Sequence, residues 1–480
     1  MHRFYPPPEN PEHRLYYEVS PLFIERGEKR EKGERDTLVL RIGDCFERRP
    51  SQPIVLHGPS GCGTTQVALR YAQQYAQHYR VIWLVDCADR ITAQTELAAL
   101  ARELNLPLYG YLRARPDLGH GVREALRWLD RNDRWLLIFD GAQDPQIVLD
   151  LLPTPAEGHV LITTAHPDWP VVHARRCRLT GIGLKPDLMA SAEVPRFTQD
   201  EGISFSLKLD ASNEPIKDVM SRFLLTLNFH PLALGIIGAL REWHVVSDLW
   251  ERACEILRIP TSAIPIRMDA DSEVLELALR IALPELERHE GALELLRLYA
   301  VLGAGRVPDA LLVALAPHLS DGERPVHRFT LSRCGLILYS HWGTRMPRAL
   351  ATCVLSLLRR AEHKALVAGA LAAMTAALAR LGYGSDAPVP ADWIPHVLAL
   401  VRRAEPLGLG GAQVTELLGR CGRSLLQLGL PESALPILEE ELVLRRRGAL
   451  ASRAMVSSPR PAPLLMASVS ECSALRNCAR

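Results

Sequence analysis

The sequence predicts a doubly wound α/β domain with a parallel sheet in its first half and a mostly helical second half. Three observations support this: four short runs that are apolar on both faces, helical patterns between them, and few strand patterns after about residue 196. Strands covered by helices on both sides read as continuous apolar runs, and their alternation with helices is typical of a parallel sheet.

Length and composition are those of a multidomain globular protein. The 480 residues are enough for roughly three to four domains of ~100–200 residues. Hydrophobic residues make up 48% of the chain, which excludes global disorder. The formal net charge of +1 gives no general attraction to nucleic acid or to anionic membranes, so neither is an expected partner.

The cysteine pattern and the apolar runs indicate a compartment. Ten cysteines are scattered without a CxxC pair or zinc spacing, which fits a reduced, cytoplasmic location without structural zinc. The N-terminus lacks the apolar core of a signal peptide. The longest apolar run, 365–379, is shorter than the ~18–20 residues that a membrane-spanning helix needs.

The elements of the first domain follow a proline- and charge-rich segment, 1–36, that we expect to be flexible. Helical patterns start at Thr64 and cover 92–105 and 118–131, and the domain is predicted to span 37–195. The predicted strands are IVL (54–56), VIWLV (81–85), WLLIF (135–139) and VLIT (160–163).

The second half is predicted to contain two small domains. A helical domain over 196–262 includes FLLTLNFHPLALGIIGAL (223–240), which predicts two helices that meet near Pro231. A domain over 263–360 contains CGLILYSHWGTRMP (334–347), a short apolar segment with a turn that we interpret as a wing.

The last helices, over 361–447, contain a stretch that resembles one tetratricopeptide unit, QVTELLGRCGRSLLQLGLPESALPILEEELVLRRR (413–447). Small or apolar residues stand where that repeat has them, at Gly422, Leu425, Gly429, Ala434 and Leu438. The unit departs from the repeat at Glu441, and an ordinary helical hairpin predicts a similar shape. Residues 448–480 are expected to form a disordered tail.

The stretch HGPSGCGTTQVALRYA (57–72) has the glycine spacing of a phosphate-binding loop. Such a loop directs backbone N–H groups at phosphate oxygens beside a helix N-terminus, and its glycines permit the close approach. Here the loop lies between a predicted strand and a predicted helix, which is the context the motif requires. The predicted nucleotide-binding residues are Gly58, Pro59, Gly61, Cys62, Gly63, Thr64, Thr65, Gln66 and, from the helical domain, Pro231.

Thr65 and Asp140 are the predicted metal-binding pair. The Thr65 hydroxyl can ligate Mg²⁺, which is expected if ATP binds. Asp140 ends an apolar strand, where a carboxylate can face the metal through water. The alternative for Asp140 is a helix cap or a strand-end turn.

Three other side chains near the loop have ordinary interpretations. We expect His57 to end a strand, and His230 to start a helix rather than to line an adenine pocket. Cys62 is interpreted as a backbone position of the loop rather than a reactive thiol.

Five blocks in order resemble the NB-ARC domain of STAND-type signalling NTPases, in the bacterial branch that carries tetratricopeptide repeats. The blocks are GPSGCGTTQVALRYA, VIWLVDC, WLLIFDGAQDP, GHVLITTAHPDW and HPLAL, and the resemblance covers roughly residues 50 to 447. It implies a nucleotide domain, a helical domain, a winged-helix domain and repeats. In that family ADP holds a closed state, and exchange for ATP opens it.

The chain departs from this family at side chains that contact phosphate or water. The phosphate-loop lysine is replaced by Thr64, the second acidic position by Gly141, and the arginine after the fourth strand by Ala165. The glycine of the family's GxP-like motif is replaced around Phe229, and Pro347 stands nearest to the winged-helix histidine.

These replacements lead to two main hypotheses. A charged hydrogen bond is worth about 1.5–3 kcal/mol, so losing the lysine weakens nucleotide binding roughly 10- to 150-fold. Phosphoryl transfer loses more, so the chain is at most a weak ATPase unless an arginine substitutes. The leading hypothesis is an ADP- or ATP-binding signalling switch whose repeats bind a protein partner or another copy. The alternative is a nucleotide-free pseudo-NTPase scaffold; a DNA-binding regulator is disfavoured by the neutral charge.

Overall fold

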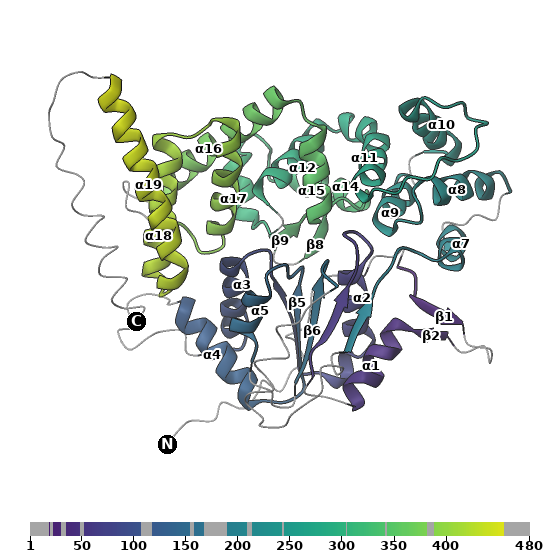
Figure 1. The fold of residues 1–480 in the computed structure, drawn as a ribbon, viewed down its shortest axis with the longest axis horizontal. Helices are drawn as coiled ribbons and strands as arrows, with labels where there is room; N and C mark the ends of the chain where they lie inside the picture. Colours follow the sequence, from purple (N-terminus) through teal and green to yellow (C-terminus); the bar gives the residue numbers. More distant parts are fainter. Residues whose placement is uncertain are drawn as a thin grey trace.

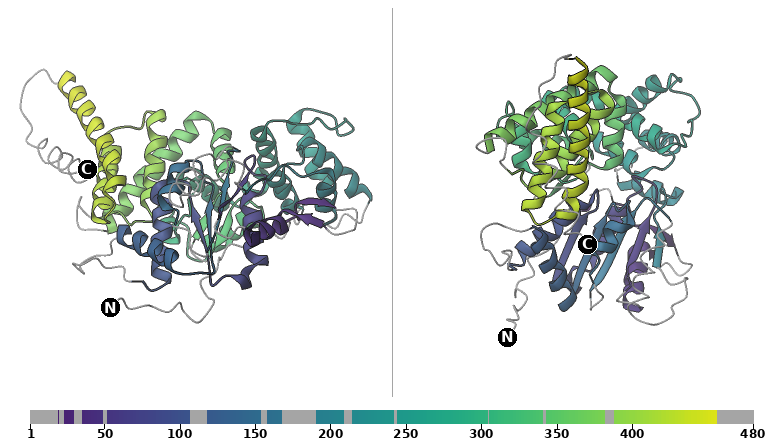
Figure 2. Two further views of the ribbon diagram at one scale, coloured as in Figure 1. Left: turned by 60° about the horizontal axis from the view of Figure 1, so that its bottom comes forward. Right: turned by 60° about the vertical axis from the view of Figure 1, so that its left-hand side comes forward.

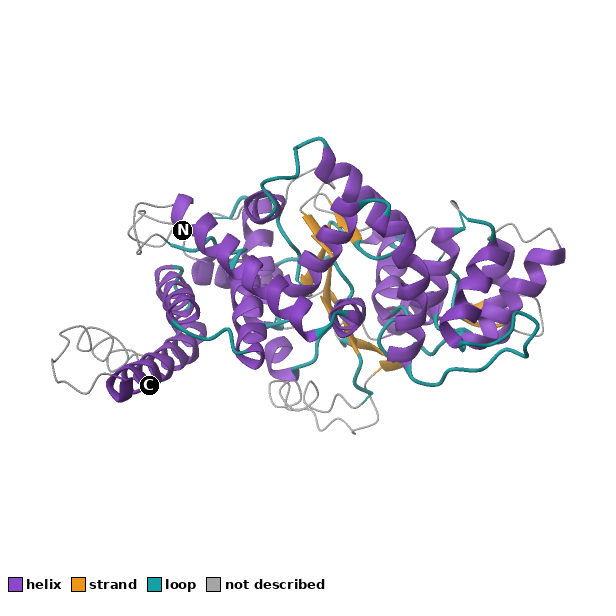
Figure 3. Ribbon diagram, turned by 90° about the horizontal axis from the view of Figure 1, so that it is seen from above, coloured by secondary structure: helices purple, strands orange, loops and turns teal. Residues whose placement is uncertain are grey.

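The α/β domain lies beneath a layer of helices formed by the second half of the chain (Figure 1). This computed structural model describes residues 19, 23–29, 35–48, 52–106, 118–153, 158–167, 190–208, 214–241, 244–303, 305–340, 343–381 and 388–455. Seen from above, the helical layer covers the carboxyl ends of the strands (Figure 3).

A five-stranded parallel sheet forms the centre of the α/β domain, as predicted. Its strands are β3 (Ile54–His57), β4 (Val81–Asp86), β5 (Trp135–Asp140), β6 (His159–Thr164) and β7 (Ala190–Glu193), in the order β4-β5-β6-β3-β7. The four predicted strands are present within one or two residues of the expected bounds. The edge strand β7 was not predicted, because its sequence ASAE has no apolar run.

Helices cover both faces of the sheet. Helices α1 (Leu38–Arg48) and α2 (Thr64–Gln74) pack on one face, against alternate residues of the strands such as Ile82 and Leu84. Helices α3 (Arg90–Glu103), α4 (Leu118–Arg131) and α5 (Pro145–Leu151) pack on the other face. Because strand side chains alternate between faces, the continuous apolar runs fill two separate cores.

The helical domain contains the helix pair predicted around Pro231. Helix α8 (Glu214–Thr226) ends and α9 (Pro231–Leu240) begins there, between α7 (Gln199–Lys208) and α10 (Val246–Leu257). The turn between α8 and α9 places Phe229 at a positive φ of 56°. Glycine adopts such a left-handed conformation most easily, and the resembled family carries glycine at this position.

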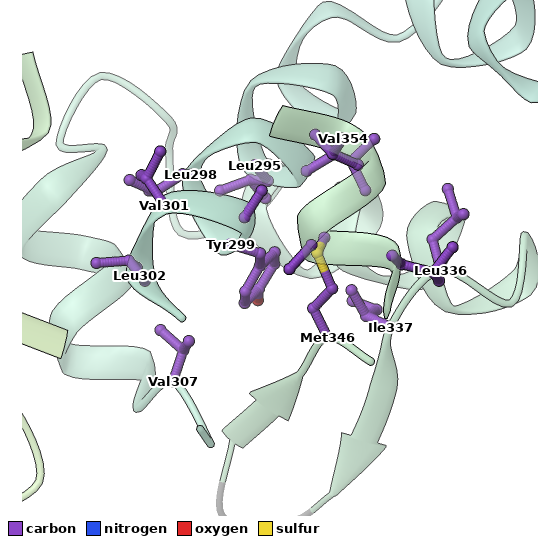
Figure 4. Close-up of a cluster of buried hydrophobic side chains, with 14 of the residues drawn as sticks. Leu295, Leu298, Tyr299, Val301, Leu302, Val307, Leu336, Ile337, Met346 and Val354 are labelled. Atoms are coloured by element: carbon purple, nitrogen blue, oxygen red, sulfur yellow. The ribbon is translucent and has the colours of Figure 1, made fainter. Parts of the chain in front are cut away.

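The predicted wing is an antiparallel hairpin, β8 (Leu338–Ser340) and β9 (Gly343–Arg345). It follows α11 (Asp271–Glu287), α12 (Glu290–Leu302), α13 (Asp309–Leu315) and α14 (Glu323–Arg333), and α15 (Arg348–Leu357) comes after it. Figure 4 shows Tyr299, Ile337 and Met346 packed at the base of this hairpin. The Val307 N–H donates to the Thr344 carbonyl at 2.8 Å, and the Thr344 N–H donates to the Val307 carbonyl at 3.3 Å. These two bonds fix β9 to the helical core.

The last helices are α16 (Arg360–Leu381), α17 (Ile394–Ala404), α18 (Ala412–Gln427) and α19 (Pro431–Met455). Helices α18 and α19 pack as a hairpin in which a Cβ on Gly422 would lie 2.4 Å from Leu438. Helix α19 extends past residue 447, and the rest of the predicted tail lies outside the described residues. Within the described ranges, no helix has the length and hydropathy of a bilayer-spanning segment.

Part of the segment predicted to be flexible is packed in the structure. Strands β1 (Gly27–Lys29) and β2 (Arg35–Thr37) form a hairpin, and Ile24 and Arg26 before it are buried. The other residues of that segment, apart from 19, 23 and 25, lie outside the described ranges.

Candidate functional site

The glycine loop connects β3 to α2, as the sequence predicts. Gly61 and Gly63 have φ values of 86° and 97°, a region that glycine enters without steric cost. Gly63 is the N-cap of α2, and the Val67 N–H is bonded back to the Gly63 carbonyl at 2.9 Å. Thr64, at the position of the family's lysine, is therefore the first helical residue, beside the unpaired first-turn amides that helix ends present.

Three successive carbonyl groups of the loop are held from outside, two of them by the start of α9 and one by the segment before β1. The pairs are Ser60 with His230 Nε2 at 3.1 Å, Gly61 with the Leu232 N–H at 3.2 Å, and Cys62 with the Arg26 guanidinium at 3.2 Å. In a trans peptide the N–H points opposite to the preceding C=O, so the contacts on the Ser60 and Cys62 carbonyls turn the amides of Gly61 and Gly63 inward. The Cys62 amide closes the turn on Pro59 at 3.1 Å. Inward-facing amides of this kind form an anion-binding concavity.

His230 fixes the helical domain to the loop. It is buried, and its Nδ1 caps α9 by accepting from the Ala233 N–H at 3.3 Å, so it starts a helix as predicted. Its ring lies so close to the loop that a Cβ on Gly61 would be 2.6 Å from Cε1. Burial lowers the pKa of His230, against the opposing effect of the Asp271 carboxylate. The neighbouring Pro231 provides the first residue of α9.

Arg26 is a loop contact that sequence reasoning missed. Besides the Cys62 carbonyl, it bonds the Pro195 carbonyl and Glu201 Oε2, the latter at 3.2 Å. Its guanidinium also stacks on Phe197, 4.4 Å from the ring centroid. In the sequence Arg26 is one of several charges in a row, and no local pattern distinguishes the buried one.

The Cys62 thiol has the ordinary role expected of it. The residue is 1% exposed, and burial raises its pKa to about 11, with a further increase from Asp271 and opposing effects from Arg26 and Arg196. A thiol with this pKa is protonated near neutral pH and is a poor nucleophile.

Asp140 and Thr65 come together at the carboxyl end of β5. Asp140 is fully buried, and its Oδ1 accepts hydrogen bonds from the hydroxyls of Thr65 and Thr163, each at 2.6 Å. The predicted pair therefore lies side by side, next to the start of α2. The Thr163 hydroxyl also accepts from the Gly141 N–H at 2.8 Å, which fixes the turn after the strand.

An arginine from the wing binds the other oxygen of Asp140. Arg345 Nη2 lies 2.5 Å from Asp140 Oδ2, and its Nε lies 3.6 Å from Asp86 Oδ2. The Arg345 side chain is 11% exposed, although it comes from β9, 205 residues along the chain from Asp140. We call this set of residues, Arg345 with Asp140 and Asp86, the wing contact.

Asp86 is a second carboxylate that the sequence analysis did not single out. It ends β4 and is the register partner of Asp140 on the neighbouring strand. Burial raises the pKa of Asp86, with an opposing effect from Arg345 and a further increase from Asp140. For Asp140 burial acts in the same direction, but Arg345 and the two hydroxyls outweigh it, so its pKa is lowered. The signal was available, because VIWLVD and WLLIFD share one pattern.

A Mg²⁺ ion does not fit on Asp140 in this conformation. Both carboxylate oxygens already accept hydrogen bonds, and the guanidinium of Arg345 takes the cation's place at Oδ2. Asp86 and Asp140 are only two carboxylates. Over the described residues, no group of three or more His, Cys, Asp or Glu side chains is placed to hold a metal.

The other replaced positions lie around this site. Gly141 has a φ of 66° with open space where a side chain would stand, so the backbone turn explains the glycine. Ala165 is exposed just after β6, and Pro347 is the N-cap of α15.

Comparison with known proteins identifies the first domain. Residues 48–152 match a family model described as an AAA domain. Among curated proteins no sequence is similar enough to count as a match.

Several solved structures resemble the fold at low identity. A STAND protein with a tetratricopeptide repeat sensor from Pyrococcus horikoshii is 15% identical, with a TM-score of 0.43; the alignment covers 84% of this chain and 58% of that one. A Walker-type ATPase of Pyrococcus abyssi is 15% identical over 69% of this chain and 99% of that one, with a TM-score of 0.31. Cdc6p of Pyrobaculum aerophilum is 14% identical over 71% and 99%, with a TM-score of 0.34.

The family match covers the residues that form the glycine loop and the strand that ends at Asp140. The sheet order and the loop geometry are independent of that match and agree with it. The chain therefore carries a P-loop NTPase domain of the AAA type.

Proposed function

We propose that this chain is a STAND-like regulatory switch that binds ADP or ATP in the glycine loop and hydrolyses ATP slowly or not at all. The observation that carries the proposal is the set of three loop carbonyls held from outside, which turns the loop amides inward. The proposed binding residues are Gly58, Pro59, Gly61, Cys62, Gly63, Thr64, Thr65, Gln66 and Pro231.

Backbone groups supply most of the phosphate contacts in such a loop, and they are in place here. The positive end of the α2 dipole adds a favourable field for an anion at Gly63 and Thr64. The replaced lysine removes one charged contact, so binding is weakened rather than abolished.

Slow hydrolysis follows from the side chains around the loop. Thr64 brings no cation to the phosphates, and Gly141 has no side chain with which to position water. Asp140 is occupied by the wing contact. These three facts act on catalysis more than on binding.

Three parts of the molecule outside the P-loop domain touch this site, which is what a switch requires. The helical domain reaches the loop through His230 and Leu232, the N-terminal segment through Arg26, and the wing reaches Asp140 through Arg345. A ligand that changes the loop thereby acts on all three. For the output we propose that α18 and α19 bind a protein partner or another copy, as the resemblance to repeats implies.

The experiment is a titration of purified protein with labelled ADP and ATP. Wild-type protein should bind with micromolar affinity or tighter, and Thr64→Lys should bind roughly 10- to 150-fold more tightly. Thr64→Met, which has similar length without charge, should not. Absence of binding at millimolar nucleotide in both the wild type and Thr64→Lys would contradict the proposal.

That negative result would favour the alternative, a pseudo-NTPase scaffold. The observation in favour of it is that Asp140 is already neutralised within the chain by Arg345. A ligand that binds the native state must raise its stability, so the scaffold predicts a melting temperature unchanged by nucleotide.

A further inference from the structure

Arg345 occupies the oxygen of Asp140 on which a metal ion would be expected. We infer that Arg345 is a tethered cation that holds the position of a divalent metal, so that the wing contact and a metal ion on Asp140 exclude each other. The inference deepens the proposed function, because it concerns the regulation of the same site.

The first argument is geometric. Thr65 and Thr163 occupy one oxygen of Asp140, and Arg345 occupies the other at 2.5 Å. A metal can gain access to Oδ2 when the guanidinium leaves it, while Thr65 stays within reach as a hydroxyl ligand. The site therefore changes its cation instead of gaining one.

The second argument is electrostatic. Asp86 and Asp140 end adjacent strands, and both are buried, at 3% and 0% exposure. Two buried carboxylates side by side repel each other and need a cation or a proton. Asp86 Oδ2 accepts no hydrogen bond within the described part of the chain, and its contact with Arg345 Nε is an ion pair at 3.6 Å. The two positive charges of a divalent ion would neutralise both carboxylates, whereas Arg345 supplies one positive charge.

The third argument is that Arg345 moves with its domain. Its strand is held to the helical core by the two Thr344–Val307 hydrogen bonds and by the bond between the Tyr299 and Thr344 hydroxyls. The position of Arg345 at the sheet therefore reports the placement of the wing. Linkage is reciprocal, so a metal that competes with Arg345 must weaken the wing contact by the same factor.

The test uses Mn²⁺ as a probe for the divalent site, followed by electron paramagnetic resonance on protein verified to be free of nucleotide. Wild-type protein should bind Mn²⁺ weakly, and Arg345→Gln should bind it at least about tenfold more tightly, because a positive charge has left two carboxylates. Arg345→Gln combined with Asp140→Asn should lose the gain. Arg280→Gln, which removes an equal charge from the surface pair with Glu276, is the matched control and should behave as wild type.

Equal Mn²⁺ affinity in the wild type and in folded Arg345→Gln would overturn the inference. If Arg345→Gln does not fold, a second measurement uses the wild type alone. Mg²⁺ should accelerate hydrogen exchange of the backbone amides around 86–88 and 343–346, compared with NaCl of equal ionic strength. No difference between the salts would overturn it. Neither measurement needs nucleotide, so failure here is distinguishable from failure of nucleotide binding.

Discussion

Two of the contacts between the helical half and the P-loop domain differ in chemistry. The wing contact is ionic and lies beside the start of α2, at the proposed nucleotide site. The second, which we call the repeat contact, joins the last helices and the segment before α13 to α3 and α4 (Figure 2). Its bonds are Arg306 to Glu96 at 3.0 Å, Ser433 to Gln94 at 3.1 Å and the Gly119 N–H to the Leu428 carbonyl at 3.0 Å.

The different chemistry of the two contacts indicates which of them a ligand can release. A cation on Asp140 would compete directly with Arg345 for the carboxylate of the wing contact. The hydrogen bonds and the ion pair of the repeat contact lie away from the loop, so the same ligand displaces no group there. We expect the wing to leave the sheet while the repeat contact persists and acts as the fixed side of a hinge.

The largest expected effect comes from breaking the wing contact on its carboxylate side. Asp140→Ala leaves Arg345 buried without its main partner, and loss of one member of a buried pair costs about 3–5 kcal/mol. The midpoint of urea unfolding measures it. Asp144→Ala, which removes the exposed N-cap of α5, is the control and should cost only about 1 kcal/mol. Equal shifts for the two variants would show that the wing contact contributes nothing special.

Breaking the repeat contact should cost slightly less. Arg306→Ala removes one member of an ion pair whose side chains are only 14% and 13% exposed, so Glu96 stays behind without this partner. We expect the free energy of unfolding to fall by about 3 kcal/mol. Burial raises the pKa of Glu96, against the opposing effect of Arg306, so Glu96→Gln should restore much of the loss in the double variant. A double-mutant cycle by thermal unfolding measures the coupling. Strict additivity of the two changes would contradict a direct pair.

A pH titration tests the buried His159 in the core of the sheet. His159 lies at the other end of the sheet, where Nδ1 is 2.6 Å from the Tyr79 hydroxyl, and burial lowers its pKa to about 4. A depressed histidine stabilises the fold above its unfolded pKa of ~6.5, and this contribution is lost as pH falls through the folded value.

Stability should therefore fall between pH 6.5 and about 4 by on the order of 2 kcal/mol, a figure reduced for partial exposure. His159→Gln should remove this slope, as measured by unfolding at several pH values. Asp140 has a lowered pKa, so its contribution is lost only as pH falls through that lower value, below this window. The raised pKa values of Asp86 and Glu96 act in the opposite sense, because stability from a raised carboxyl group is lost as pH rises. A slope that persists in His159→Gln would assign the effect elsewhere.

The smallest expected effect tests how the hairpin of α18 and α19 is packed. Gly422→Ala places a methyl 2.4 Å from Leu438, and overpacking of this kind costs about 1–2 kcal/mol. Gly419→Ala on the same helix meets only the carboxyl group at the far end of the Glu441 side chain, which can turn with its partner Arg445, and should cost less. Melting temperatures of the two variants provide the comparison, and the reverse order would contradict this packing of α18 on α19.

The sequence was sufficient for features that are encoded locally. Strands β3 to β6 were predictable because apolar runs report burial on both faces, and the helix start at Pro231 because proline fits a first turn. The pairing of Thr65 with Asp140 followed from the known geometry of strand ends and loops.

The features that were missed depend on tertiary contacts. Arg345 reaches Asp140 across 205 residues, and Arg26 reaches the loop from a run of similar charges, so neither has a local signature. Asp86 carries the same signal as Asp140, but only the strand order shows that the two are neighbours.

The most direct test of the central claim is to identify the nucleotide released when purified protein is denatured. Arg26, His230 and Leu232 hold the loop carbonyls from outside, and we expect this preformed loop to retain nucleotide through purification. We predict release of ADP or ATP from the wild type and none from folded Gly61→Ala, whose methyl would strike His230. An empty loop in folded wild-type protein, with none taken up from millimolar ADP, would contradict the account.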